Sequence, residues 1–184
     1  IVTALLQHQD ALVMLPTGAG KSLCFQLPAL VQDGLSVVVS PLVALMENQV
    51  QALQIRQAPA ALLHSEQSRE QRQQTLYKLA QGQLKLLYLS PESLLSPPLW
   101  QQLLGVSSRL RSLIIDEAHC ITQWGSSFRP AYRRLGALRS ALQLQHAAHP
   151  ISIAAFTATA DPITQRDIQQ VLGLKQPQVF RSSP

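Results

Sequence analysis

The chain has 184 residues, of which 46% are hydrophobic and 14% are charged, and its formal net charge is +5. This composition excludes a disordered chain and suffices for one domain with a buried core. The apolar run at 35–46 is broken by Pro41 and falls well short of the ~20 residues that span a bilayer, so we expect no membrane association. The positive charge fits a polyanionic partner such as nucleic acid, although many basic domains bind none.

The two cysteines, Cys24 and Cys120, match no zinc-binding spacing. We recognise no signal peptide and expect both to be reduced thiols of a cytosolic protein, packed as small apolar side chains. Because the chain begins at Ile1 rather than at a methionine, we take it as a piece of a longer protein.

Short apolar runs alternate with helix-like stretches along the whole chain. The expected strands are 11–15, 35–40, 60–64, 84–90, 110–116, 151–157 and 178–180, and the expected helices are 20–32, 42–57, 68–81, 91–104, 131–145 and 162–172. Ser68 with Gln71 forms a capping box, and Asp161 before Pro162 is typical of a helix start. The alternation predicts a three-layer α/β fold with a mostly parallel sheet of about seven strands and helices on both faces.

A glycine-rich turn follows the first expected strand and opens a helix, as a phosphate-binding loop does. The candidate phosphate ligands are Pro16, Thr17, Gly18, Ala19, Gly20, Lys21 and Ser22. The glycines let backbone N–H groups face inward, Lys21 would reach the β- and γ-phosphates, and Ser22 would hold Mg²⁺. Leu15 occupies the position of the first glycine in the strict pattern, so the loop is a helicase-type variant.

A second apolar strand, 110–116, runs directly into two carboxylates. Asp116 can bind Mg²⁺ through water, and Glu117 can orient and deprotonate the attacking water. Carboxyl ends of strands are where open α/β sheets bind ligands. The two elements together predict metal-dependent hydrolysis of a nucleoside triphosphate.

Three further polar residues are candidates for coupling nucleotide state to a partner. His119 lies three residues after Asp116, and the hydroxyls of Thr157 and Thr159 end the strand at 151–157, from which they could contact the acidic pair. A structural hydrogen bond is the alternative role for a lone histidine, and the Thr-Ala-Thr sequence is a weak signal by itself.

Large aromatic side chains occupy the glycine-serine loop after the carboxylates. Trp124 and Phe128 could stack on nucleic-acid bases, worth about 1–3 kcal/mol each, and Arg129 could pair with a phosphate or with an acid of the site. The alternative is that Phe128 packs in the core and Pro130 starts the next helix.

These segments together resemble the first RecA-like lobe of a superfamily-two helicase, and more closely the RecQ family of DNA helicases. The segments are LPTGAGKSLCFQLPAL, VVVSPLVALMENQV, LLYLSPE, DEAHCITQWGSSFRPAY and FTATAD, in the family's order. The resemblance implies a RecA-like P-loop fold, with residues 1–180 forming the ATP-binding domain and 181–184 starting a linker to a second RecA-like lobe. It also implies ATP-driven 3′-to-5′ translocation on single-stranded DNA and duplex unwinding in recombination and repair.

The resemblance also assigns residues to DNA. It implies that the loop with Gln123, Trp124, Phe128 and Arg129 senses single-stranded DNA and couples that contact to ATP hydrolysis. It implies backbone contacts from a second group: Ser40, Pro41, Asn48 and Gln49. The implied partners are single-stranded and partly duplex DNA and the second lobe, with no membrane.

ATP and Mg²⁺ are the cofactors that the resemblance implies, and zinc belongs only to a domain further along such a protein. The implied location is the cytoplasm at the nucleoid in a bacterium, or the nucleus in a eukaryote. Because the second lobe supplies arginines worth several orders of magnitude in rate, we expect little ATPase activity and no unwinding from this piece by itself.

Two other interpretations remain. An RNA helicase or double-stranded DNA translocase would share the phosphate residues but not the CITQW and FRP segments. A degenerate, nucleotide-gated DNA-binding module would keep the fold without hydrolysis, against which the intact Lys21, Ser22, Asp116 and Glu117 argue. The serines at Ser126 and Ser127, where the family usually has histidine and aspartate, favour weaker coupling between DNA and hydrolysis.

Replacing these serines (Ser126→His with Ser127→Asp) in the full-length protein is expected to raise the stimulation of ATP hydrolysis by single-stranded DNA, because it restores polar contacts typical of the family. The ratio of hydrolysis rates with and without DNA measures the effect. A control with alanine at both positions should give no increase, and an unchanged ratio in the His-Asp variant would count against the idea.

Overall fold

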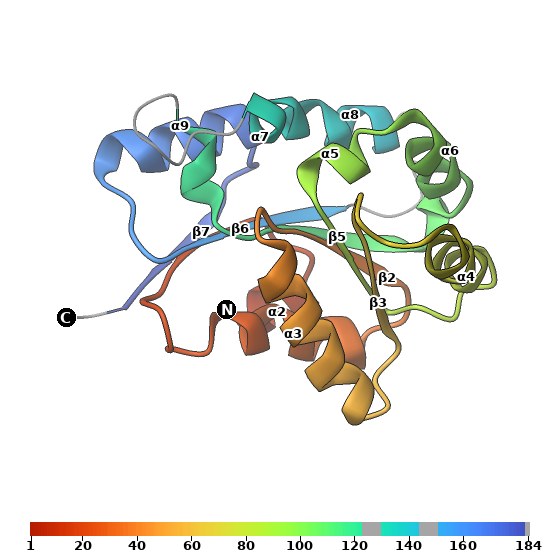
Figure 1. Ribbon diagram of the computed structural model, residues 1–184. Coiled ribbons are helices and arrows are strands. Elements are labelled where there is room, and N and C mark those ends of the chain that lie inside the picture. Colours follow the sequence, from red (N-terminus) through yellow and green to blue (C-terminus); the bar gives the residue numbers. More distant parts are fainter. Residues whose placement is uncertain (123–129, 144–150, 183–184) are drawn as a thin grey trace.

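The computed structural model describes residues 1–122, 130–143 and 151–182. Its centre is a sheet of seven strands in the order β3-β4-β2-β5-β6-β1-β7, and every neighbouring pair is parallel (Figure 1). The strands are β1 (Ala11–Met14), β2 (Leu35–Val39), β3 (Ala60–Leu63), β4 (Leu86–Leu89), β5 (Leu110–Ile115), β6 (Ser152–Thr157) and β7 (Gln178–Arg181). All seven predicted strands are confirmed.

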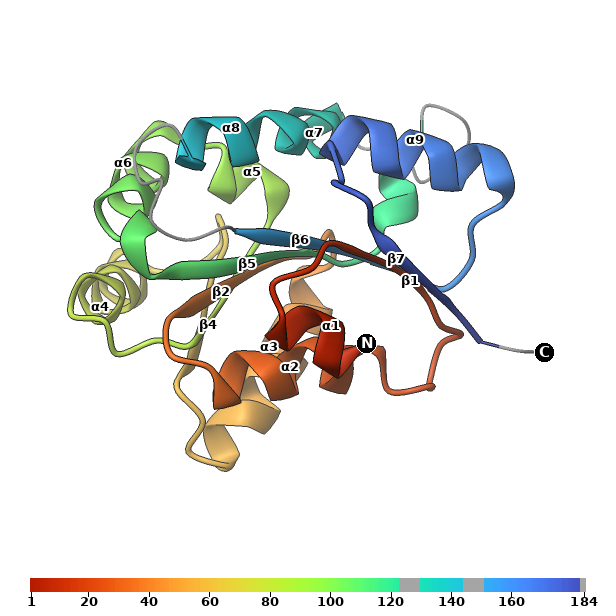
Figure 2. The same cartoon turned by 180° about the vertical axis from the view of Figure 1, so that it is seen from behind.

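Helices cover both faces of this sheet, which makes the three predicted layers (Figures 1 and 2). The α-helices are α1 (Val2–Leu6), α2 (Lys21–Val31), α3 (Val43–Ile55), α4 (Arg69–Ala80), α5 (Pro91–Leu94), α6 (Pro97–Gly105), α7 (Pro130–Arg134), α8 (Leu138–Gln143) and α9 (Pro162–Leu172). Short 3-10 turns are η1 (Ser107–Arg109), η2 (Ala118–Ile121) and η3 (Leu135–Ala137).

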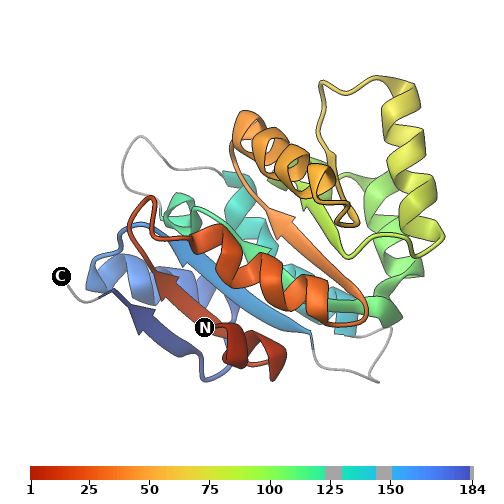
Figure 3. The same ribbon diagram turned by 90° about the horizontal axis from the view of Figure 1, so that it is seen from below.

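The core lies in two separate layers because alternate residues of each strand point to opposite faces. One layer packs α1, α2 and α3 against the sheet around Phe25, Met46 and Phe156, and Figure 3 views these helices in front of the strands. The other layer packs α4 to α9 around residues such as Tyr132 and Leu172. Strands buried on both faces explain why their sequences are almost wholly apolar.

The predicted helix starts at Ser68 and Asp161 are confirmed. The Ser68 hydroxyl accepts a hydrogen bond from the Gln71 amide while the Gln71 side chain accepts one from the Ser68 amide, which is a complete capping box. The Asp161 carboxylate accepts from the Thr164 amide at 2.7 Å, with Pro162 in the first turn of α9.

Two predicted helices are broken, and one helix was missed. The expected helix 91–104 is two helices, because Pro97 and the following proline lack N–H groups and restart the chain as α6. The expected helix 131–145 is interrupted by η3, where a β-carbon on Gly136 would lie 1.8 Å from the Val171 carbonyl oxygen of α9. The five-residue α1 has no side-chain cap to predict it.

Both cysteines are free thiols, as expected. Cys120 is buried, whereas Cys24 is only half-buried on α2, so the expectation of a buried side chain holds for Cys120 alone.

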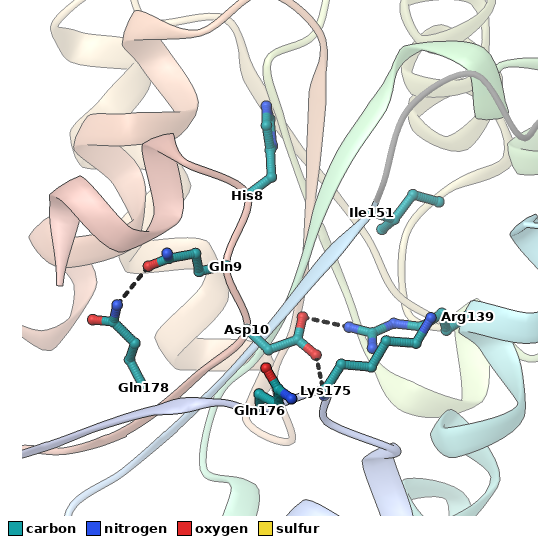
Figure 4. A pocket seen from close by; sticks show the side chains of 8 residues that line it. All are labelled: His8, Gln9, Asp10, Arg139, Ile151, Lys175, Gln176 and Gln178. Carbon is teal, nitrogen blue, oxygen red and sulfur yellow. Dashed lines mark hydrogen bonds and ion pairs between the residues drawn. The ribbon is translucent and has the colours of Figure 1, made fainter.

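A buried ion pair holds the amino-terminal ends of two strands of the sheet in place (Figure 4). The Arg139 guanidinium of α8 donates to the carboxylate of Asp10, which directly precedes β1, and both side chains are at least 94% buried. The same carboxylate accepts from the backbone amides of Ile153 at 2.9 Å and Lys175 at 2.6 Å. Arg139 also donates to the Gly173 carbonyl at 3.1 Å. The pair therefore joins β1, β6, α8 and the turn after α9, beside a cavity of about 270 Å³.

Removing the cation from this pair (Arg139→Met) is expected to lower the free energy of unfolding by about 3–5 kcal/mol, because it leaves the Asp10 charge buried without its partner. Urea denaturation followed by circular dichroism measures the loss. The control is Arg134→Met at an exposed position of α7, expected to change stability by less than about 0.5 kcal/mol. Equal stability of the two variants would show that the pair does not hold the edge.

Candidate active site

Two residues of the loop between β1 and α2 take left-handed conformations, and the Ala19 amide donates to the Pro16 carbonyl at 3.2 Å within the loop. Gly18 has φ +84° and Gly20 has φ +78°, and in both cases a β-carbon would meet no atom within 4 Å. A side chain at either position would therefore be strained by its backbone and would fill open space in front of the loop. Gly20 is the N-cap of α2, so Lys21 and Ser22 open the helix beside this space.

The two carboxylates follow β5, two strands away from β1 in the sheet. Asp116 is 4% exposed and its amide still bonds to the Val39 carbonyl of β2 at 2.8 Å. Glu117 then turns abruptly with φ 48° and ψ 46°, a left-handed conformation that is uncommon for a residue other than glycine. Such a conformation costs on the order of 1–3 kcal/mol and persists only where surrounding contacts hold it.

An ion pair joins the loop to the carboxylates. The Lys21 Nζ lies 3.1 Å from Glu117 Oε1, and both side chains are largely buried. The surrounding pocket, about 330 Å³, is lined by Thr17, Gly18, Gly20, Lys21, Ser22, Leu23, Leu45, Gln49, Asp116 and Glu117. Five of the seven predicted phosphate residues and both predicted acids therefore line one pocket, across 96 positions of sequence. Ala19 is not among the lining residues, and Pro16 lines a separate pocket with Thr159.

His119 connects the acids to the end of β6. Its Nδ1 lies 3.3 Å from Glu117 Oε2 and 3.1 Å from the Thr157 hydroxyl. Because that hydroxyl donates its own proton to the Thr159 carbonyl at 3.0 Å, it accepts from the histidine. Thr157 thus contacts the acidic motif through His119 and neither of the two carboxylates directly, whereas Thr159 takes part through its backbone oxygen.

The ionisable groups of the site are shifted in different directions. Burial, followed by the charge of Glu117, raises the pKa of Asp116 to about 6. The hydrogen bond from His119 lowers the pKa of Glu117, with Lys21 acting in the same direction against burial. Contacts with the Cys120 sulfur, 3.9 Å away, and with Glu117 raise the pKa of His119 to about 10. Glu117 is accordingly an anion between two cations.

The residues present fit a magnesium-bound nucleotide. Mg²⁺ in phosphate sites usually takes one or two protein ligands plus phosphates and waters, and the Ser22 hydroxyl and Asp116 carboxylate both line the pocket. Within the described ranges no group of three or more His, Cys, Asp or Glu side chains could hold a metal ion by itself. The site can therefore hold a metal together with phosphate oxygens.

The predicted DNA residues are divided between two places. Ser40 and Pro41 follow β2, and Asn48 is exposed on α3, whereas the Gln49 side chain of the same helix lines the nucleotide pocket. Gln123, Trp124, Phe128 and Arg129 lie outside the described residues.

The roles of two residues next to Asp116 were not foreseen. The buried Ser40 hydroxyl has no hydrogen-bond partner of standard geometry among the described residues, yet it lies close enough to Asp116 to lower the pKa of that carboxyl. The hydroxyl of the buried Tyr132 donates to the Asp116 carbonyl at 3.0 Å, and this bond fixes the turn formed by Asp116 and Glu117 from the core side. The only sequence signal for Tyr132 is its place on an apolar helix face.

The chain belongs to the DEAD/DEAH box helicase family, whose profile matches residues 1–168. Among the described residues, no helix is both long and apolar enough to cross a membrane.

Within that family the relatives are RecQ helicases. The chain is 57% identical to "ATP-dependent DNA helicase RecQ" of Synechocystis sp. over 184 residues, which is 100% of this chain and 38% of that protein. It is 49% identical to the RecQ helicase of Haemophilus influenzae, over 95% of this chain and 27% of the relative. The chain thus spans well under half the length of these relatives and corresponds to the RecQ-type ATP-binding domain.

Solved helicase structures share the fold. The DUF1998 helicase MrfA has a TM-score of 0.76 at 18% identity, covering 100% of this chain and 30% of that one. The Hef helicase domain of Pyrococcus furiosus has a TM-score of 0.68 at 18% identity, covering 100% of this chain and 37% of that one. The predicted RecA-like architecture is confirmed.

Proposed function

We propose that this chain is the ATP-binding lobe of a DNA helicase that couples ATP hydrolysis to 3′-to-5′ movement along single-stranded DNA and to duplex separation, in recombination and repair. The observation that carries the proposal is the contact between Lys21 and Glu117, because it brings the phosphate loop and the acidic pair into one pocket. The DNA-helicase names of relatives up to 57% identical support DNA as the polymer.

Each residue of the pocket has a part in this proposal. The N–H groups of the loop hold the phosphate chain, with Pro16 and Thr17 shaping the turn before Gly18 and Ala19 lying between the two glycines. Lys21 neutralises the β- and γ-phosphates, for which it must release Glu117. Freed in this way, Glu117 orients a water and takes its proton. Ser22 and, through water, Asp116 would hold Mg²⁺, which would supply charge neutralisation of the phosphates when bound.

DNA acts on this site through the residues around it. Pro41 and Asn48 contact the DNA backbone, and the loop with Gln123, Trp124, Phe128 and Arg129 meets the bases. Ser40, which is buried beside Asp116, does not reach the DNA directly. The His119–Thr157 contact, supported by Thr159, connects the acids to the end of β6 and passes the signal on. We propose that a second RecA-like lobe follows residues 1–180 through a linker that begins at 181–184, and that any zinc lies in a further domain. A DNA partner places the protein at the bacterial nucleoid or in the nucleus.

Hydrolysis is expected to depend on the Glu117 carboxylate. In the full-length protein Glu117→Gln should lower the ATP hydrolysis rate by about 100-fold or more, because an amide cannot take a proton from water. Binding of a non-hydrolysable ATP analogue, measured by fluorescence titration, should be retained. The control is Glu70→Gln at an exposed position of α4, which should hydrolyse normally. Full hydrolysis by the Glu117 variant would remove it as the base.

The proposal as a whole is tested by steady-state ATP hydrolysis of the full-length protein with and without single-stranded DNA. We expect strong stimulation by DNA and a much smaller effect of single-stranded RNA of the same length. The isolated 184-residue chain should hydrolyse ATP slowly and unwind nothing, because it lacks the arginines of a second lobe.

Three outcomes would each overturn a part of the proposal. Robust turnover by the isolated chain would contradict the need for a second lobe. Stimulation by RNA alone would favour an RNA helicase. Basal hydrolysis that DNA leaves unchanged would favour the degenerate, nucleotide-gated module.

A further inference from the structure

A buried amide on the phosphate-loop helix joins α2 to the neighbouring helix. Gln26 lies one turn after Lys21 and is 8% exposed. Its Nε2 donates to the Tyr88 hydroxyl of β4 at 2.8 Å and to Gln49 Oε1 of α3 at 3.4 Å. Neighbouring residues on the same helix, Phe25 and Ala29, belong to the apolar core. An amide among them is costly unless it is hydrogen-bonded, so its partners decide what it does.

The partner on α3 faces the nucleotide. Gln49 and Leu45 form the α3 wall of the pocket that holds Lys21 and Glu117. Because Gln49 Oε1 accepts from Gln26, its own amide group is left as a donor at that wall. Asn48, the adjacent residue, is exposed on the outside of the same helix. Helix α3 therefore has one side at the pocket of Lys21 and Glu117 and another side at the proposed DNA surface.

We propose that the Gln26–Gln49 amide pair is the positioning element that couples α3 to the pocket of Lys21 and Glu117, so that DNA contact at Asn48 of α3 and phosphate contact at Lys21 favour one another. This inference rests on the proposed function. Bound phosphates fix the start of α2, α2 carries Gln26, and Gln26 sets the place of α3 through Gln49. By linkage, DNA that stabilises the same place of α3 raises the affinity for nucleotide.

The test is carried out on the full-length protein with Gln26→Leu, which keeps the volume and removes the amide. The factor by which single-stranded DNA changes the KM for ATP, and the ratio of stimulated to basal hydrolysis, should each fall by about five-fold or more, with basal hydrolysis unchanged. A purely structural role would lower stability and leave both factors as they are. If the leucine variant does not fold, Gln26→Asn, which stays polar but is too short to reach Gln49, serves in its place.

The matched control is Tyr88→Phe, which removes the other hydrogen bond of Gln26 and leaves the pair intact. It should retain the stimulation ratio of the original protein, and a loss as large as that of Gln26→Leu would overturn the proposal. In a Gln49→Leu background, adding Gln26→Leu should cause no further loss of stimulation, because the contact between the two side chains is already broken. Independent, multiplying losses would contradict the pairing.

The failure of this inference is distinguishable from failure of the proposed function. If the original protein shows no DNA stimulation, the proposed function fails. If the original protein is stimulated and both Gln26 variants are stimulated equally well, only the coupling role of the amide pair is overturned.

Discussion

The contact between Lys21 and Glu117 is the interaction on which the rest of the site depends. It spans the carboxyl ends of β1 and β5, between which only β6 lies in the sheet. A parallel sheet puts these ends on one edge, and the glycines and the left-handed Glu117 turn both backbones toward the same space. In a largely buried setting a lysine and a carboxylate attract each other more strongly than they do in water. In the proposed function the phosphates of the nucleotide compete with Glu117 for that lysine, so that nucleotide binding would break the pair.

The surrounding contacts explain why an unfavourable backbone at Glu117 persists. Three hydrogen bonds hold the acidic turn. The Asp116 amide donates to a carbonyl of β2, the Tyr132 hydroxyl donates to the Asp116 carbonyl, and His119 contacts the Thr157 hydroxyl. Each of these comes from a different element, so the conformation is a property of the assembled sheet. The strained backbone is that of Glu117, whose carboxylate pairs with Lys21. Loss of the Lys21 contact would therefore change the interactions of a residue that is already in an unfavourable conformation.

The sheet and the two halves of the site could be predicted because both follow from local patterns. Strands buried on two faces are continuous apolar runs, and polar residues directly after them must meet at one edge. The Gln49 side chain could not be assigned from the sequence, because its direction depends on how α3 packs against α2. The break at Gly136 also depends on a distant carbonyl, that of Val171. The left-handed turn at Glu117 could not be predicted because the residue is not a glycine. Helix α1 has only five residues, too few to show a helical repeat of apolar side chains.

The Asp10–Arg139 pair and the pocket of Lys21 and Glu117 lie at opposite ends of the strands. The ion pair ties β1, β6 and α8 together at the edge of the sheet opposite to the nucleotide pocket. This buried pair therefore anchors the fold at the end of the strands that lies away from the pocket of Lys21 and Glu117. Such a lobe is evolvable: changes in what the carboxyl edge recognises need not be offset by compensating changes in the scaffold.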